Sequence, residues 1–148
     1  MDSIDTMILG ANTYKMFVSY WPEATQEGAF GEKLNSLSKY VVSSTLEDAP
    51  WGKWEGAELI SNKPMEAIAK LKQKSGKDIV VWGSLTLAES LMKDGLIDEY
   101  QLWVCPIVLG KGKPLFAGDS TLPLTLLEAK TYDAGMVLLR YQPDEKNK

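Results

Sequence analysis

The run Asp78-Ile79-Val80-Val81-Trp82 constrains the fold of this chain more than any other segment. Four apolar residues follow one another without polar alternation, so the run predicts a strand that is covered on both faces. Gly83 and Ser84 follow directly, and Thr86 stands three residues before Glu89, the spacing of a capping box at a helix start. A buried strand that leads at once into a helix is typical of α/β proteins with a parallel sheet.

Strand and helix patterns alternate along the first two thirds of the chain. β-branched and apolar runs predict further strands, and Gly, Pro and hydroxyl residues mark the ends of the helices. The predicted strands are 6–9, 40–42 and 58–60. The predicted helices are 12–21, with Asn12 as its N-cap, a second helix that begins at Pro64 and ends at Gly76, and a third at 86–94. Residues 23–38 are expected to form a connector. This order predicts a mostly parallel central sheet with flanking helices.

The last third of the chain has a different pattern. One long apolar strand is predicted at 100–108, and two further runs lie around Leu126 and at 136–141. Asp133-Ala134-Gly135 separates these two runs and is typical of a hairpin turn. We therefore expect a single α/β domain over residues 1–148, whose sheet finishes in an antiparallel C-terminal hairpin.

Composition narrows the chemistry. The 148 residues carry 16 basic and 20 acidic side chains, a net charge of −4, which argues against a nucleic-acid partner. The chain has no histidine, so the commonest general base and the commonest zinc ligand are both absent, and we expect no metal site. Such a chain is better suited to host a cofactor than to act as a hydrolase with a Ser-His pair.

Cysteine usage and hydropathy predict the compartment. Cys105 is the only cysteine and stands in an apolar run, so we interpret it as a core residue. No apolar stretch approaches the length of a membrane span, and the first residues show no leader pattern. These features predict a cytoplasmic protein without a membrane partner.

Small and hydroxyl residues follow three of the predicted strands. In open α/β sheets ligands bind beyond the carboxyl ends of the strands, where glycine lets the backbone approach a phosphate and helix N-termini offer unpaired N–H groups. These residues are Gly10 with Asn12 and Thr13, then Ser43, Ser44 and Thr45, and then Gly83, Ser84 and Thr86. They predict a dinucleotide site, although ordinary turns and caps need the same residue types and G-x-G-x-x-G is absent.

Three segments resemble the dihydrofolate-reductase-like fold, in the branch of the riboflavin-biosynthesis reductase domain. DTMILGANTYKMFVSYWP at 5–22 resembles the strand that runs into a G-R-x-T-Y-E helix start, and KYVVSSTL at 39–46 resembles the second cofactor-side strand. Residues 78–116 resemble the G-S-x-x-L helix, the G-L-[IV]-D-E turn and the P-x-x-L-G-x-G-x-x-L-F loop. The resemblance implies a three-layer α/β architecture and an NADPH-dependent reductase, with NADH as a second possible cofactor.

The resemblance also implies a role for each matched residue. The first helix start and the Gly83-Ser84 helix start would hold the pyrophosphate, and Ser43, Ser44 and Thr45 would line the adenosine end. The implied cofactor residues are Gly10, Asn12, Thr13, Ser43, Ser44, Thr45, Gly83, Ser84, Leu85, Thr86 and Leu87, with Asn12, Leu85 and Leu87 acting through their backbone.

This sequence departs from the family pattern in two ways. Ala11 replaces the common arginine, which puts a preference for NADPH over NADH in doubt. The family's first strand has no counterpart in the matched segments, so we expect that residue 1 marks either a truncation relative to the family or a misplaced start. We therefore expect that the 148-residue chain alone does not turn over a substrate.

The first functional hypothesis is hydride transfer to a C=N or C=O bond of a small pterin-like or pyrimidine-like substrate. No catalytic acid is assigned, because none of the matched motifs contains a clear one. The alternative is a non-catalytic dinucleotide-binding protein on the same scaffold. We also expect a homodimer, because the C-terminal strands present Trp103, Leu138 and Tyr141; filling of the monomer's own core is an equal alternative.

Overall fold

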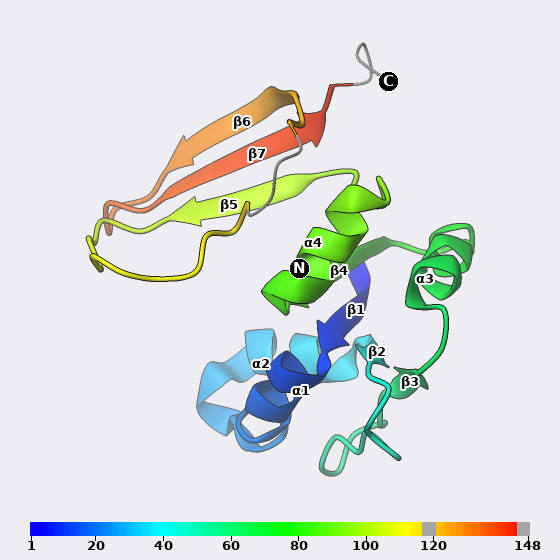
Figure 1. Ribbon diagram of the computed structural model, residues 1–148. Helices are drawn as coiled ribbons and strands as arrows, with labels where there is room; N and C mark the ends of the chain where they lie inside the picture. Colours follow the sequence, from blue (N-terminus) through cyan, green and yellow to red (C-terminus); the bar gives the residue numbers. More distant parts are fainter. Residues whose placement is uncertain (117–120, 145–148) are drawn as a thin grey trace. The chain divides into compact units, whose positions relative to one another are not determined.

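The computed structural model describes residues 1–116 and 121–144 (Figure 1). The chain divides into two compact units, Met1–Asp94 and Gly95–Lys148. Within the described ranges, no helix has the length and apolar character that a membrane crossing requires.

The first unit is built on a parallel four-stranded sheet with the order β3-β2-β1-β4. The strands are β1 (Ile4–Gly10), β2 (Ser38–Val42), β3 (Glu58–Ile60) and β4 (Asp78–Gly83); the helices are α1 (Ala11–Val18), α2 (Gly28–Ser36), α3 (Pro64–Lys72) and α4 (Leu85–Lys93), with short 3₁₀ turns η1 (Trp21–Glu23) and η2 (Thr25–Glu27). This arrangement confirms the predicted mostly parallel sheet with helices.

The central strand β1 explains why the sheet has a core on both faces. Successive side chains of a strand point to opposite faces, and the residues from Thr6 to Gly10 are all buried. Met7 and Leu9 belong to a buried cluster that includes Tyr14 of α1 and Trp51. Ile8 lies on the opposite face of the strand and is also completely buried. A strand buried in this way requires the continuous apolar run that the sequence shows.

The helix α2 corrects the sequence prediction of a connector at 23–38. Its buried residues Gly31, Leu34 and Asn35 follow the helical i, i+3, i+4 spacing. Only Leu34 among them is a large apolar residue, so the apolar signal is weak. The helix is stabilised by tertiary packing, which overrides the low propensity of its two glycines.

Both helix starts at the sheet edge differ in detail from the prediction. Gly10, and not Asn12, is the N-cap of α1, and Asn12 lies exposed in the first turn. Helix α4 begins at Leu85, not Thr86, because Ser84 is its N-cap and its Oγ accepts a hydrogen bond of 3.3 Å from the N–H of Leu87. Helix α1 also ends earlier than expected, at Val18.

The second unit is an antiparallel sheet with the order β5-β7-β6, from β5 (Tyr100–Val104), β6 (Leu124–Thr131) and β7 (Val137–Pro143). The predicted hairpin is confirmed, since β6 and β7 are joined through Tyr132, whose N–H donates to the carbonyl of Met136 at 2.9 Å. Strand β5 stops at Val104, not at 108, because Pro106 has no N–H to donate to a ladder. The interpretation of Cys105 as a core residue is wrong, because it lies exposed beyond the end of this strand.

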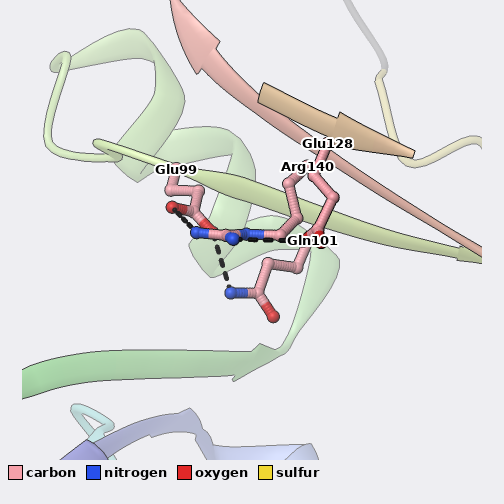
Figure 2. A network of polar contacts seen from close by, with 4 residues as sticks. All are labelled: Glu99, Gln101, Glu128 and Arg140. Atoms are coloured by element: carbon pink, nitrogen blue, oxygen red, sulfur yellow. Dashed lines mark hydrogen bonds and ion pairs between the residues drawn. The ribbon is translucent and has the colours of Figure 1, made fainter. Parts of the chain in front are cut away.

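A polar network joins the three strands of the second unit (Figure 2). The guanidinium of Arg140 on β7 donates to both oxygens of Glu99, at 2.8 and 2.9 Å, and to Glu128 of β6 at 3.2 Å. Gln101 of β5 donates to the same Glu99 carboxylate at 2.8 Å. These hydrogen bonds lower the pKa of Glu99 from its ordinary value, because they favour the charged carboxylate. The network is a structural clamp across the sheet.

Candidate cofactor site at the sheet edge

The three candidate segments lie at the same edge of one sheet. Strand β1 has β2 on one side and β4 on the other, and all three run parallel. Gly10 at the end of β1 is in register with Val42 of β2, and its neighbour Leu9 is in register with Gly83 of β4. The carboxyl ends of β2, β1 and β4 therefore lie side by side, which places Ser43 next to the start of α1.

Four of the expected residues approach each other closely at the ends of β1 and β4. A Cβ on Gly10 would lie 2.6 Å from Oγ of Ser84, and a Cβ on Gly83 would lie 3.0 Å from Oγ1 of Thr13. Gly83 also has a φ of 133°, a conformation that residues with side chains rarely adopt. Glycine is therefore required at both positions, and the starts of α1 and α4 are brought together at the same place.

Both helices offer backbone N–H groups at this edge. The first N–H groups of a helix have no acceptor within the helix, and the macrodipole gives this end a partial positive charge. No side chain caps α1, and Ser84 satisfies only the N–H of Leu87 in α4. The unshared N–H groups of Ala11, Asn12, Leu85 and Thr86 suit an anion such as a phosphate.

The hydroxyl cluster after β2 has two different kinds of member. Ser43 is buried, and its Oγ accepts hydrogen bonds from the N–H groups of Thr45 and Leu46, at 3.2 and 3.1 Å. This hydroxyl closes a turn, as ordinary turn chemistry requires. Ser44 and Thr45 are exposed and are the members whose hydroxyls can reach a ligand.

The expected leucines also differ in their placement. Leu87 is buried, whereas Leu85 is exposed in the first turn of α4. Thr13 is buried, and its close approach to Gly83 makes it a spacer between the two helix starts. Leu85 therefore lies at the sheet edge, whereas the side chain of Leu87 belongs to the core.

No charged side chain belongs to these segments, which read GANT at 10–13, SST at 43–45 and GSLTL at 83–87. Within these segments, electrostatic attraction for an anion comes from the helix termini. Ala11 is the first residue of α1 and adds no charge there. The arrangement can bind and orient a polyanionic ligand, but these segments contain no acidic or basic side chain that could donate a proton to a substrate.

Sequence analysis did not predict two hydrogen bonds that the buried side chains of Trp51 and Tyr14 form. The indole N–H of Trp51 donates to Oδ1 of Asn35 at 2.6 Å, and the hydroxyl of Tyr14 donates to the carbonyl of Pro50 at 2.7 Å. Burial raises the pKa of Tyr14, with a smaller contribution from Asp48, so this hydroxyl stays protonated as a donor. The sequence shows a tryptophan within a polar loop, but the neighbouring residues do not indicate which distant side chain this tryptophan contacts.

A family model, a relative and a solved structure each match most of this chain. The sequence model of the RibD C-terminal domain matches residues 1–138. The uncharacterized protein YyaP of Bacillus subtilis is 30% identical over 145 residues, which cover 95% of this chain and 75% of YyaP. The crystal structure of a putative riboflavin biosynthesis protein from Shewanella sp. PV-4 is 25% identical with a TM-score of 0.78, over 98% of this chain and 77% of that chain.

A more distant solved structure shares the fold. The dihydrofolate reductase of Enterococcus faecalis, complexed with NADP(H) and RAB-propyl, has a TM-score of 0.60 at 15% identity, over 97% of this chain and 77% of that chain. At this identity the likeness concerns the fold alone. Because the family model spans almost the whole chain, the chain belongs to the RibD C-terminal domain family, a reductase-type family with a dihydrofolate-reductase-like α/β fold.

Proposed function

We propose that this chain binds NADPH across the carboxyl ends of β2, β1 and β4. The observation that carries the proposal is the close approach of Gly10 to Ser84 and of Gly83 to Thr13, which joins two helix N-termini at one point. Two such termini supply enough unshared N–H groups for the two phosphates of a pyrophosphate. The exposed hydroxyls of Ser44 and Thr45 follow the neighbouring strand and suit the adenosine end.

We further propose that the whole protein is a reductase of a small pterin-like or pyrimidine-like molecule. NADPH held there would supply the hydride that reduces a C=N or C=O bond of the substrate. The residues of this chain bind and orient the dinucleotide through the α1 and α4 termini, and the proton is drawn from water or from the substrate. The chain spans 75% of the length of YyaP, so the activity is proposed for a protein that includes any further segments.

One observation favours a second candidate, a dinucleotide-binding protein without turnover. None of the eleven expected site residues carries an acidic or basic side chain, so none can serve as a general acid. The two candidates share the binding step and differ only in catalysis.

A titration tests the binding step. NADPH fluorescence is followed as the chain is added, and saturable binding is expected below millimolar nucleotide. The double variant Ser44→Ala/Thr45→Ala should weaken NADPH binding several-fold, because it removes about one or two hydrogen bonds to the nucleotide. Ser75→Ala, at an exposed serine before β4 and so at the opposite end of the strands, is the matched control and should leave binding unchanged.

The outcome of the titration distinguishes the proposed functions from a sheet edge that binds no nucleotide. If neither NADPH nor NADH binds at millimolar concentration, the sheet edge contains only turn and cap chemistry. If NADPH binds but is not consumed with pterin or aminopyrimidine substrates, by this chain or by a version extended upstream of Met1, the non-catalytic candidate is favoured.

A further inference from the structure

A buried polar clamp holds the segment that follows Ser43, Ser44 and Thr45. The segment is residues 46–57, called here the 46–57 loop, and its Trp51 is almost completely buried. Asn35 of α2 uses both ends of its amide, accepting from the indole of Trp51 at 2.6 Å and donating to the carbonyl of Trp21 at 2.8 Å. Asn35 is itself only 4% exposed, so the loop is fastened to α2 in the interior of the first unit.

Helix α1 holds the same loop one residue earlier. The hydroxyl of Tyr14 donates to the carbonyl of Pro50 at 2.7 Å, and the Tyr14 ring packs on Trp51 with 6.1 Å between centroids. Tyr14 comes directly after Thr13, which approaches Gly83 at the other helix start. The loop is therefore tied to the same helix whose first turn belongs to the proposed cofactor site.

The loop is fixed at both of its ends. At the beginning, the Ser43 hydroxyl accepts from the N–H groups of Thr45 and Leu46; further on, Pro50 and Trp51 are held by α1 and α2. A third tie comes from Lys39 of β2, whose buried ammonium donates to the carbonyl of Glu55 at 3.2 Å. Ser44 and Thr45 lie between fixed points although their side chains are exposed.

We infer that Trp51 and Asn35 are positioning residues, which set where Ser44 and Thr45 stand relative to the first turn of α1. The inference rests on the proposed function. It deepens that function by assigning control of the adenosine end to a hydrogen-bonded pair that does not touch the nucleotide. A site must be supported by side chains locked in one place, because a shift of about 1 Å is enough to weaken binding.

The physical reason is that each polar atom of the buried Asn35 amide needs a hydrogen-bond partner. Trp51→Phe keeps an aromatic ring in the core but leaves Oδ1 of Asn35 without its indole donor. Without this hydrogen bond the 46–57 loop can move away from α2, and the hydroxyls of Ser44 and Thr45 then move with the loop. The starts of α1 and α4 are held by Gly10 and Gly83 and stay in place.

The experiment measures the two ends of the nucleotide separately. Binding of NADPH, of adenosine 2′,5′-bisphosphate and of reduced nicotinamide mononucleotide is titrated for the wild type and for Trp51→Phe. We expect NADPH and the adenosine fragment to bind on the order of tenfold more weakly in the variant, with the nicotinamide fragment unchanged. Hydrogen exchange at the amides of Thr45 and Leu46 should become faster in the same variant.

Two further variants separate positioning from stability. Ile68→Val trims a buried side chain of α3 and should lower the melting temperature while leaving all three affinities unchanged. Asn35→Asp keeps an acceptor for the Trp51 indole and should retain more of the adenosine-end affinity than Asn35→Leu. All binding is measured at a temperature where circular dichroism shows each variant to be folded.

The outcomes distinguish the inference from the function beneath it. If the wild type binds NADPH and Trp51→Phe binds both fragments as the wild type does, the positioning role is wrong and the proposed function stands. An equal loss for both fragments also overturns it, because that result indicates general destabilisation. If the wild type binds no nucleotide, the proposed function fails, and the inference fails with it.

Discussion

Gly10 at the end of β1 and Ser84 at the start of α4 lie so close that a Cβ on Gly10 would be 2.6 Å from the Ser84 Oγ and 3.0 Å from its backbone nitrogen. The contact with the Oγ is shorter than real Cβ atoms show, and the contact with the backbone nitrogen is tighter than most and cannot be relieved by a side-chain rotation. The absent side chain of Gly10 therefore determines how near the starts of α1 and α4 come to each other.

Gly10→Ala should damage both stability and nucleotide binding. Overpacking at this contact is expected to cost about 1–3 kcal/mol in the free energy of unfolding, and NADPH should bind on the order of tenfold more weakly. Urea unfolding and NADPH titration measure the two effects. Gly112→Ala is the control, because nothing lies within 4 Å of a Cβ at Gly112. Equal stability of the two variants would show that the first contact is not tight.

Ala11→Arg should change the cofactor preference. Ala11 lies in the first turn of α1 and the site segments carry no cation, so the wild type should discriminate only modestly between NADPH and NADH. An arginine there can form charge-assisted hydrogen bonds with the additional phosphate of NADPH. The ratio of the two dissociation constants should therefore move toward NADPH. An equal improvement for both nucleotides would refute the assigned role of position 11.

The Glu99–Arg140 pair should make the stability of the second unit depend on pH. Its hydrogen bonds hold the pKa of Glu99 below the ordinary 4.5, so the folded state binds this proton less readily than the unfolded state. The stabilisation is fully present above pH 4.5 and is lost as the pH falls through the folded-state pKa. Glu99→Gln should cost about 1 kcal/mol at neutral pH, because the pair is bidentate but about a third exposed.

Unfolding of the wild type and of Glu99→Gln in urea at pH 7 and pH 3 checks this dependence. The difference between the two proteins should shrink at the lower pH. Glu89→Gln serves as the control, because Glu89 forms an exposed i,i+4 pair with Lys93 that contributes about 0.3–0.5 kcal/mol. A Glu99→Gln difference that is the same at both pH values would contradict the assigned cause.

We propose that the chain forms a homodimer through apolar residues of the second unit. Trp103 is 49% exposed and Leu126 51% exposed, whereas Leu138 is buried and Tyr141 partly buried. Exposed apolar residues favour association, and Trp103 packs against the 37% exposed Tyr132 with 5.0 Å between ring centroids. Light scattering should show a dimer at micromolar concentration, and Trp103→Gln should weaken it. Met16→Gln, which removes an exposed methionine from α1, should have no effect; a wild-type monomer would contradict the proposal.

Local patterns in the sequence were sufficient to predict the elements that have strong periodicity. The apolar run of β4 and the Gly-Ser pair after it predicted a parallel strand that leads into a helix, and this order is confirmed. The expected cover on both faces is not found, because β4 is the last strand of its sheet and its residues are partly or fully exposed. The Asp133-Ala134-Gly135 turn predicted the hairpin of β6 and β7 for a similar reason, since Gly135 adopts a φ of 77° that glycine tolerates. Gly10, Ser43 and Gly83 were expected at strand ends, and the sheet brings those ends together.

Long-range contacts decided the remaining features. Helix α2 forms in a polar, glycine-containing segment because Leu34 and Asn35 are buried against residues far along the chain, and no local pattern encodes that burial. Cys105 stands in an apolar run, yet Pro106 ends the ladder there and leaves it exposed. The closeness of Gly10 to Ser84, 74 positions apart, and the bond between Asn35 and Trp51 exist only once the sheet has assembled, because each needs two segments that only tertiary packing brings into contact.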